Sequence, residues 1–549
     1  MANESVCIIG GGATGAALLW CLAQDERARA ETTVTLLHEG SDLGGHSMTV
    51  PVNRGGKTLD VDLGVQLISP LIYANVRLML GLDDFAPMVP MTDYDQLELA
   101  CAYPDENGAP RNWANFDAYQ GDPLFSLYSP QMRANSHRFQ EFLETAAFRG
   151  WAGKSVQDYF ATATGYGSPQ DQQDWIDYFL WPYLSIINGY GAALMDQTLV
   201  GDLIPFFMSL PDVETPLGSF TQPGRGWQRF TNGAQSWVAA MATIAHGLDR
   251  SSIVLLDCRV TQINTPQSGD TRPEVVWVDG GGTQHFERFD KVVSTLDMQT
   301  NASLLQQSPY WAGVYKNHID PSLWSLQPGA CYIHTDPSVL SPRLRNTNGQ
   351  TGFEQETLQF TAYYAPQGAY PYYDLYKTYT TYLQANLLGD PAAAGVYNTM
   401  YGYIPQPGVD TMPDPDSVLY SQTWIHSKFA PSYASSAKKS LYQAQAPGMT
   451  KSYPGQPPSG VYFAGNNTTY DSEDGALEAA MIIAGYAFGV DYPFIDLPHD
   501  DRHPISQALG WFLYESYYGV MFPGALPGHV SGHWYGLVAH AVKHALLNR

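Results

Sequence analysis

Short apolar runs, glycine turns and helix-favouring segments alternate in three separated parts of the chain. In the first part, residues 6–9 form a compact β-favouring run, residues 10–15 are rich in glycine, and residues 16–23 are mostly alanine and leucine. A second apolar run at residues 33–37 leads to Glu39. Compact β-favouring runs are typical of strands buried in a parallel sheet, and alanine and leucine favour helices. The pattern predicts a strand, a turn, a helix and a second strand.

The other two parts repeat this pattern. In the middle of the chain a glycine turn leads into a predicted helix and then into predicted strands, at residues 237–246, 253–256, 258–263, 274–278, 286–289 and 291–296. Later, a predicted strand at residues 460–466 precedes a predicted helix from Gly475 to Phe488. Acidic residues stand just before Gly475, as suits the N-terminus of a helix.

The segments between these parts are richer in proline and aromatic residues. Amphipathic helices are predicted at residues 136–148 and 171–184. Trp181, Tyr183 and Tyr190 are candidate pocket residues, although ordinary core packing explains them as well. The tail, residues 491–549, is predicted to pack on the body through a helix at residues 536–547.

The composition indicates a folded protein with a large core, since 44% of the residues are hydrophobic and 15% are charged. A net charge of −25 argues against binding to nucleic acid or to an anionic membrane surface. The five cysteines are scattered, which favours buried free thiols over disulfides or a zinc site. Without an apolar run of membrane-spanning length, and with a strand starting near Met1, we expect a cytoplasmic protein.

The glycine turn matches G-x-G-x-x-G through Gly10, Gly12 and Gly15, with Ala13 and Thr14 between the last two glycines. The first glycine permits a tight turn, the second lets the backbone approach a pyrophosphate, and the third lets the helix pack closely on the strand. The start of the helix then offers N–H groups to phosphates. An acid after the second strand, here Glu39, suits the ribose hydroxyls of an adenosine. Because no arginine follows Glu39 closely, a 2′-phosphate is not expected, and the stretch predicts a dinucleotide site.

A glycine pair, Gly44 and Gly45, follows Glu39 after a short spacer, and His46 comes next. The segment at residues 60–66 then carries a D-x-G sequence. In this order the motifs resemble those of FAD-dependent flavoproteins of the amine oxidase and phytoene desaturase type. The resemblance implies that the glycine pair and His46 lie beside the cofactor. It also implies that the flavin ring is approached by the second segment, through Gly64, Val65 and Gln66.

The later parts resemble the remaining cofactor segments of the same group. The resemblance implies that the backbone of Val260 contacts the adenine. The closing motif corresponds to Gly465 and Asn466, followed by the helix start at Gly475 and Ala476, whose N–H groups would face the pyrimidine carbonyl of the flavin. Asn466 replaces the acid that is usual in this motif, so its contact with the cofactor is expected to be neutral. No cysteine stands where some members attach FAD covalently, so non-covalent FAD is expected unless His46 forms the link.

Candidate substrate-side residues lie in the second intervening segment. Tyrosines recur from Tyr363 to Tyr382, and residues 376–382 and 424–428 are predicted strands. A tyrosine-rich sheet would line a cavity, although a hydrated strand pair without a ligand fits the pattern too. Since a lysine near the flavin assists oxygen in many amine oxidases, Lys377 and Lys428 are candidates for that role, with Tyr376 beside them. The histidine pairs His529/His533 and His540/His544 lack a nearby carboxylate, so no metal is expected.

The resemblance implies an α/β fold: a Rossmann-like FAD-binding domain with an interleaved α+β substrate domain. We expect residues 1–68, 230–298 and 452–490 in the FAD domain, and residues 69–229 and 299–451 in the substrate domain. The expected reaction transfers a hydride from an apolar or aromatic small molecule to the flavin. Two alternatives stay open: a redox-neutral flavoenzyme, such as an unsaturated fatty acid double-bond isomerase or hydratase, and a non-catalytic scaffold stabilised by FAD. Substrate, electron acceptor, catalytic base and oligomeric state are not specified by the sequence.

Overall fold

A computed structural model gives the structure of the chain. It describes residues 3–68, 73–93, 98–104, 110–114, 125–127, 130–146, 151, 154–176, 180, 200, 203, 228–265, 272–308, 310–312, 315–317, 319, 324–340, 357–364, 376–429, 460–465, 468–469 and 472–494. Trp181, Tyr183, Tyr190, Asn466, the tail beyond residue 494 and its histidine pairs lie outside these described residues.

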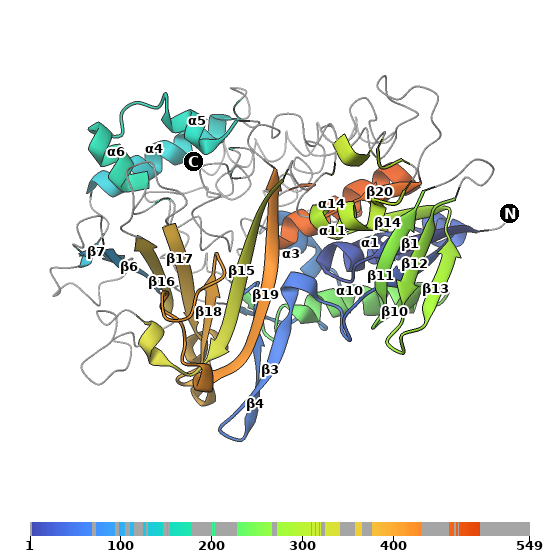
Figure 1. The fold of residues 1–549 in the computed structure, drawn as a ribbon, viewed down its shortest axis with the longest axis horizontal. Coiled ribbons are helices and arrows are strands. Elements are labelled where there is room, and N and C mark those ends of the chain that lie inside the picture. Colours follow the sequence, from blue (N-terminus) through green and yellow to red (C-terminus); the bar gives the residue numbers. More distant parts are fainter. Residues whose placement is uncertain are drawn as a thin grey trace.

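A five-stranded parallel sheet forms one half of the structure (Figure 1). Its strand order is β10 (Ile253–Leu255), β2 (Thr32–Leu37), β1 (Glu4–Ile9), β14 (Lys291–Ser294) and β20 (Val461–Phe463). Residues 6–9 of the central strand are all buried, which explains their unbroken apolar sequence. The three parts of the chain that share one sequence pattern therefore meet in one sheet.

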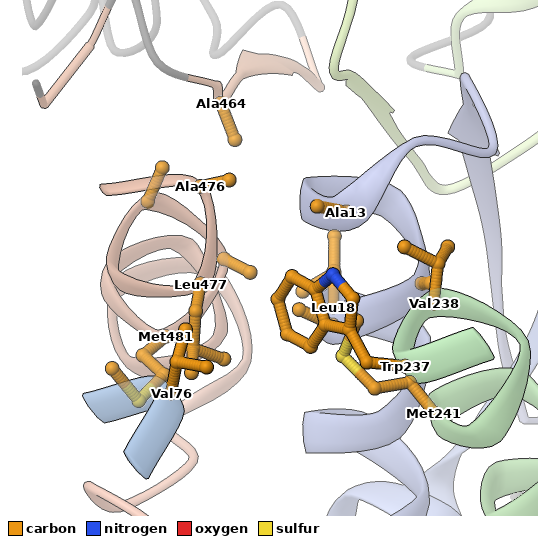
Figure 2. Close-up of a cluster of buried hydrophobic side chains, with 14 of the residues drawn as sticks. Ala13, Leu18, Val76, Trp237, Val238, Met241, Ala464, Ala476, Leu477 and Met481 are labelled. Carbon is orange, nitrogen blue, oxygen red and sulfur yellow. The ribbon is translucent and has the colours of Figure 1, made fainter. Parts of the chain in front are cut away.

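Three helices pack together beside this sheet: α1 (Ala13–Gln24), α10 (Gln235–Leu248) and α14 (Glu473–Phe488). Every residue of α1 from Ala13 to Ala23 is buried, in keeping with its nearly continuous apolar sequence. Figure 2 shows the core between the helices, where Trp237 of α10 lies between Leu18 of α1 and Leu477 of α14. Helix α14 ends at Gly489, whose φ of 67° is the left-handed conformation that glycine adopts readily.

An eight-stranded mixed sheet forms the other half (Figure 1). Its order is β19 (Val418–Phe429), β15 (Trp324–His334), β18 (Tyr397–Tyr401), β17 (Tyr376–Leu383), β16 (Thr357–Tyr364), β6 (Glu98–Pro104), β7 (Pro110–Ala114) and β8 (Phe125–Leu127). β16 pairs in parallel with β6, and β7 pairs in parallel with β8, whereas the other neighbours are antiparallel.

Smaller elements complete the two halves. β11 (Arg259–Asn264), β12 (Glu274–Val278) and β13 (Gln284–Arg288) form an antiparallel sheet, β3 (Thr49–Arg54) pairs with β4 (Lys57–Asp62), and β5 (Met91–Asp93) pairs with β9 (Gln228–Phe230). The remaining helices are α2 (Glu26–Glu31), η1 (Gly45–Ser47), α3 (Ala74–Leu80), α4 (Pro130–Ala146), α5 (Val156–Phe160), α6 (Pro169–Trp175), α11 (Met298–Leu305), η5 (Tyr315–Asn317), η7 (Pro337–Val339), α12 (Gln384–Leu388), η10 (Pro391–Ala393) and η11 (Pro415–Ser417).

The predicted strands and helices of the parallel half are confirmed, and their bounds differ by a few residues. Helix α1 starts at Ala13 instead of residue 16, because Gly12 is its N-cap. Helices α4 and α6 also start earlier than predicted. For α6 the cause is a capping box between Ser168 and Asp171, with Pro169 in the first turn. The thiols of Cys7, Cys21, Cys258 and Cys331 are free and buried, as expected.

Candidate functional site

The glycine turn after β1 is closed by contacts that only glycine permits. Gly10 has a φ of 106°, and a Cβ built on it would lie 2.5 Å from Thr295 Oγ1. A Cβ built on Gly15 would overlap the carbonyl oxygen of Gly10. The first and third glycines of the motif therefore let α1 begin directly against the ends of β1 and β14.

No described side chain accepts an N–H at the start of α1, whereas acids from other elements do so at the starts of α10 and α3. The N-cap of α1 is Gly12, no described side chain caps it, and no acid stands in its first turn. By contrast, Asp62 accepts a hydrogen bond from the N–H of Ala234 at the start of α10 (2.7 Å), and Asp474 accepts from Val76 in α3 (2.7 Å). Orphan N–H groups and the helix dipole attract anions. The start of α1 therefore suits a phosphate group.

The glycine pair packs directly against this helix start. The N–H of Gly44 donates to the carbonyl oxygen of Gly11 (2.9 Å). Gly45 has a φ of 62°, and a Cβ on it would lie 3.0 Å from the Cα of Gly12. The two glycine motifs therefore form one surface of bare backbone.

The starts of two further helices hold the same loop. Gln235 of α10 donates from Nε2 to the carbonyl oxygen of Leu43 (2.7 Å) and accepts the N–H of Thr49 (3.2 Å). From α14, Glu473 accepts a buried hydrogen bond from Ser47 Oγ (2.8 Å). Residues 43–49 therefore connect the starts of α1, α10 and α14.

Asp62, at the end of the β3–β4 hairpin, is a buried acid with several partners. Its Oδ1 accepts from Thr49 Oγ1 (2.6 Å) and from the N–H of Ala234. Its Oδ2 lies 3.6 Å from an Arg229 guanidinium nitrogen, and both side chains are buried. Burial raises the pKa of Asp62 to about 6, although Arg229 and the hydrogen bonds oppose this shift.

Residues of the other half of the molecule, in and beside the eight-stranded sheet, form hydrogen bonds with the 62–66 segment. Asn398 of β18 donates from Nδ2 to the carbonyl oxygen of Asp62, and Cys331 of β15 donates to Asn398 Oδ1 (2.8 Å). Gln384 donates to Gln66 Oε1 (3.4 Å), and Gln66 in turn donates to the Asp62 carbonyl oxygen. The predicted cofactor residue Gln66 is thus buried in a network that joins the two halves.

Gly64 makes its close backbone approach to His46. A Cβ on Gly64 would overlap the His46 carbonyl oxygen and would lie 3.6 Å from the Trp424 indole. The rings of His46 and Trp424 are 5.6 Å apart at an interplanar angle of 52°. His46 is exposed and Trp424 is half-buried. The rings of His46 and Trp424 form an aromatic wall where β19 meets the 62–66 segment.

Strand alternation separates the two candidate lysines. Trp424 shares a face of the sheet with Cys331, because its register partner Gly329 lies two residues from Cys331 in β15. Position 428 lies four residues further along β19 and so falls on the same face of the sheet. In β17, Tyr382 is opposite Asn398, so position 376 falls on that face and position 377 on the other.

At the other end of the site, Glu39 is exposed beyond β2 and has a basic neighbour. Arg259 Nε of β11 lies 4.0 Å from Glu39 Oε1. Val260 is the next residue of β11. On the other side of Glu39, His38 accepts the N–H of Gly11 at Nδ1 (3.1 Å). Partial burial lowers the pKa of His38, so its ring is neutral and can accept this hydrogen bond. Although no arginine follows Glu39 closely in the sequence, the fold brings Arg259 near it.

At the start of α14, the N–H groups of Gly475 and Ala476 have partners within the chain. Gly475 donates its N–H to Ser472 Oγ (2.9 Å), and Ala476 donates to the Ser472 carbonyl oxygen (2.9 Å). Both N–H groups are thus paired with Ser472, the N-cap of this helix, and their predicted contact with the flavin stays a prediction. Gly465 has a φ of 142°, and its carbonyl oxygen accepts from Thr468 Oγ1 (2.8 Å).

Several residues of the candidate site were not predicted from the sequence. Arg229, Gln235, Asn398 and Arg259 act through partners that are distant along the chain, and no local motif marks them. Among the described residues, no group of three or more His, Cys, Asp and Glu side chains could hold a metal ion. In that same part of the chain, every helix is too short or too polar to cross a membrane.

Comparison with known proteins supports the fold. A family described as an NAD(P)-binding Rossmann-like domain matches residues 8–81. No curated protein matches the chain. A CLA-producing fatty acid isomerase from P. acnes superposes with a TM-score of 0.51 at 13% identity, over 88% of this chain and 99% of that one. An oxidoreductase from Methanosarcina mazei gives 0.50 at 14% identity, over 87% and 99%. Cyclohexylamine oxidase from Brevibacterium oxydans IH-35A gives 0.49 at 13% identity, over 88% and 100%.

The predicted fold class is thereby confirmed. The chain contains a Rossmann-like unit with a parallel sheet, and nearly its whole length shares the fold of the first two proteins. The resemblance found in the sequence therefore holds for the fold. At these identities the likeness concerns the fold and leaves the reaction open.

Proposed function

We propose that the chain is a FAD-dependent enzyme that oxidises an apolar or aromatic small molecule by hydride transfer. The observation that carries the proposal is the start of α1, which is capped by none of the side chains that the structure describes and faces the glycine pair with bare backbone. At other helix starts in this half, a side chain of Asp62, Asp474 or Ser472 accepts a backbone N–H. A diphosphate fits the remaining helix start in charge and in the space that the absent side chains leave.

The residues around this helix start fit the rest of a dinucleotide. Gly12, Ala13 and Thr14 would hold the phosphates, and Glu39 would accept hydrogen bonds from the ribose. The adenine would lie beside Val260, and the loop from Gly44 to His46 would follow the cofactor toward the 62–66 segment. When bound, FAD supplies the hydride acceptor.

The protein's own contribution is to fix the segment that forms the floor of the site. Asp62 is held by Thr49 and Ala234, and its carbonyl oxygen is held by Asn398. Two halves of the molecule therefore fix the position of Gly64, and a displacement of either half would disturb the site.

The aromatic wall of Trp424 and His46 would exclude water and contact the substrate. Lys428 is the better candidate for assisting oxygen, because its position shares the strand face of Trp424, whereas position 377 lies on the opposite face. Position 376 falls on the same strand face as position 382, so Tyr376 stays a weaker candidate.

A redox-neutral flavoenzyme is the second candidate. The likeness of the whole fold to a fatty acid isomerase supports considering it. An isomerase would convert substrate without consuming an acceptor, whereas an oxidase would consume one acceptor for each product. Measuring oxygen consumption beside product formation separates the two.

The test of the proposal is reconstitution of the purified full-length chain with FAD. We expect a yellow protein with a saturable flavin spectrum, which is bleached anaerobically by one of a set of amines, amino acids and polyenes. A protein that does not take up FAD would contradict the proposal. Uptake without bleaching or isomerisation by any compound would favour the scaffold alternative.

A further inference from the structure

The imidazole ring of His38 lies between the glycine turn after β1 and the loop that leads to the glycine pair. Its Nδ1 accepts the N–H of Gly11 (3.1 Å), and its Nε2 donates to the carbonyl oxygen of Asp42 (2.9 Å). A backbone N–H can only donate and a carbonyl oxygen can only accept, so the ring has no proton at Nδ1 and carries one at Nε2. The ring therefore joins the two segments only in its neutral form and in this tautomer.

Glycines make room for this ring on two sides. A Cβ built on Gly11 would lie 2.7 Å from His38 Cγ and would overlap the Leu43 side chain, and a Cβ on Gly40 would lie 2.9 Å from His38 Nε2. Gly11 stands at an unspecified position of G-x-G-x-x-G, so the motif does not explain why it lacks a side chain. The explanation is the packing of His38 and Leu43 against it.

The backbone fixes His38 from both directions. Its N–H donates to the carbonyl oxygen of Leu255 (3.0 Å), and its carbonyl oxygen accepts the N–H of Cys258 (2.7 Å). The loop that follows returns to the glycine turn, where Gly44 donates its N–H to the carbonyl oxygen of Gly11 (2.9 Å). Gly11 is buried, so loss of the imidazole acceptor would leave its N–H without the hydrogen bond that holds this side of the turn.

The charged groups around the ring act on it in opposition to burial. Glu39, Asp42 and Asp257 favour the protonated ring, whereas burial disfavours it and is the larger effect, so the pKa of His38 lies below its ordinary value of 6.5. Arg259 is the cation nearby, 4.0 Å from Glu39. The ring is therefore neutral at pH 7 and makes both hydrogen bonds. A second proton, at Nδ1, would turn its acceptor into a donor that faces a backbone N–H.

We propose that His38 is a positioning residue that holds the glycine turn and the glycine pair together around a dinucleotide diphosphate, and that protonation of its ring releases them. The bare backbone of the site comes from the two segments that the ring joins, since a Cβ on Gly45 would lie 3.0 Å from the Cα of Gly12. Nucleotide affinity therefore falls as the ring gains a proton. This inference rests on the proposed function, because it concerns the site of the cofactor.

The test measures the dissociation constant of ADP-ribose with the nucleotide-free full-length protein from about pH 8 to about pH 5, a range that spans the titration of histidine. This ligand carries the diphosphate and lacks the flavin. The amide oxygen of His38→Asn takes the place of Nδ1 and cannot be protonated, so this variant should bind within about threefold of the wild type at the upper end of the range. At the lower end, the wild type should have lost at least about fivefold more affinity than His38→Asn.

His38→Leu removes the acceptor and keeps most of the packing volume. It should weaken ADP-ribose about tenfold at every pH, because the Gly11 N–H loses its partner. Amide hydrogen exchange of the nucleotide-free protein gives a readout that does not depend on a ligand. A peptide covering residues 8–13 should exchange faster in His38→Leu than in the wild type, and His38→Asn should restore the protection.

His246→Asn is the matched control. His246 is an exposed histidine in the last turn of α10, and its replacement should leave the pH profile of the wild type unchanged. An affinity that rises at low pH, identical profiles for the wild type and His38→Asn, or equal binding by the Leu and Asn variants would overturn the inference alone. If the wild type bound neither ADP-ribose nor FAD at any pH, the proposed dinucleotide site would fail, and this inference with it.

Discussion

Two acid–arginine pairs of similar geometry lie at opposite ends of the candidate site. Asp62 and Arg229 are 3.6 Å apart, with 2% and 6% of their side chains exposed. Glu39 and Arg259 are 4.0 Å apart, with 73% and 65% exposed. Distance alone does not distinguish them, but their surroundings give them different physical roles.

The buried pair belongs to the architecture. Asp62 also accepts from Thr49 and from the start of α10, so it joins the hairpin to a helix, and removing either charge leaves the other without compensation. The exposed pair is screened by water and contributes little to folding, but an incoming ligand can reach it. Burial therefore separates a charge pair that stabilises the fold from one that an incoming ligand can reach.

Loss of a charge from the buried pair should destabilise the protein most. Asp62→Ala should lower the free energy of unfolding by about 3–5 kcal/mol, because Arg229 stays buried without its acid and the N–H of Ala234 loses its acceptor. Denaturant titration followed by circular dichroism measures the change. Asp390→Ala is the control, since its partner Lys57 lies at 3.2 Å but on the surface. Equal losses of unfolding free energy in the two variants would contradict the different roles of buried and exposed pairs.

Titration of Asp62 should make the free energy of unfolding depend on pH. Its pKa is raised from 3.8 to about 6, so at pH 5 the folded protein keeps a proton that the unfolded chain has released. Its contribution to stability is therefore highest at low pH and is lost as the pH rises from about 4 to 6. The stability difference between wild type and Asp62→Asn should shift by about 3 kcal/mol across this range, measured by denaturant titration. A difference that does not vary with pH would contradict the raised pKa.

Gly15→Ala tests the bare backbone at the start of α1. A Cβ there would overlap the Gly10 carbonyl oxygen, so the variant should lose about 1–3 kcal/mol of stability and bind FAD more weakly. Gly247→Ala in α10 is the matched control, because a Cβ there meets nothing within 4 Å and should be neutral or stabilising. Flavin fluorescence titration and thermal unfolding measure both effects. If the FAD affinity of Gly15→Ala were unchanged, the glycine turn would not take part in binding the cofactor.

The sequence predicts the parallel half well because its signals are local. The glycines, the apolar run of β1 and the helix-favouring residues of α1 act within a few positions of one another. The early start of α6 was also readable, since Ser168 and Asp171 form a capping box. The division of the chain into a cofactor domain and a substrate domain stays a prediction.

The site residues that were missed share a different property. Arg229 and Arg259 carry ordinary sequence contexts, and each gains its role from an acid that the fold brings near. Gly475 and Ala476 were placed correctly at a helix start, but the cap by Ser472 uses their N–H groups. Strand register distinguishes Lys428 from Lys377, and pairings between distant strands cannot be derived from local pattern.

Variants of the exposed pair should change stability least, and they test directly how the two charge pairs differ. Arg259→Ala should change the free energy of unfolding by less than about 0.5 kcal/mol, because an exposed ion pair at 4.0 Å is screened by water. Arg229→Met should cost several times more, since Asp62 would remain buried beside an uncharged side chain. Combining Arg229→Met with Asp62→Asn should recover part of that loss, whereas Glu39→Gln added to Arg259→Ala should change nothing. Denaturant titrations of the four variants measure these differences. A large loss of unfolding free energy in Arg259→Ala would mean that the exposed pair also stabilises the fold. Any effect of this variant on ligand binding would then be a consequence of the altered structure.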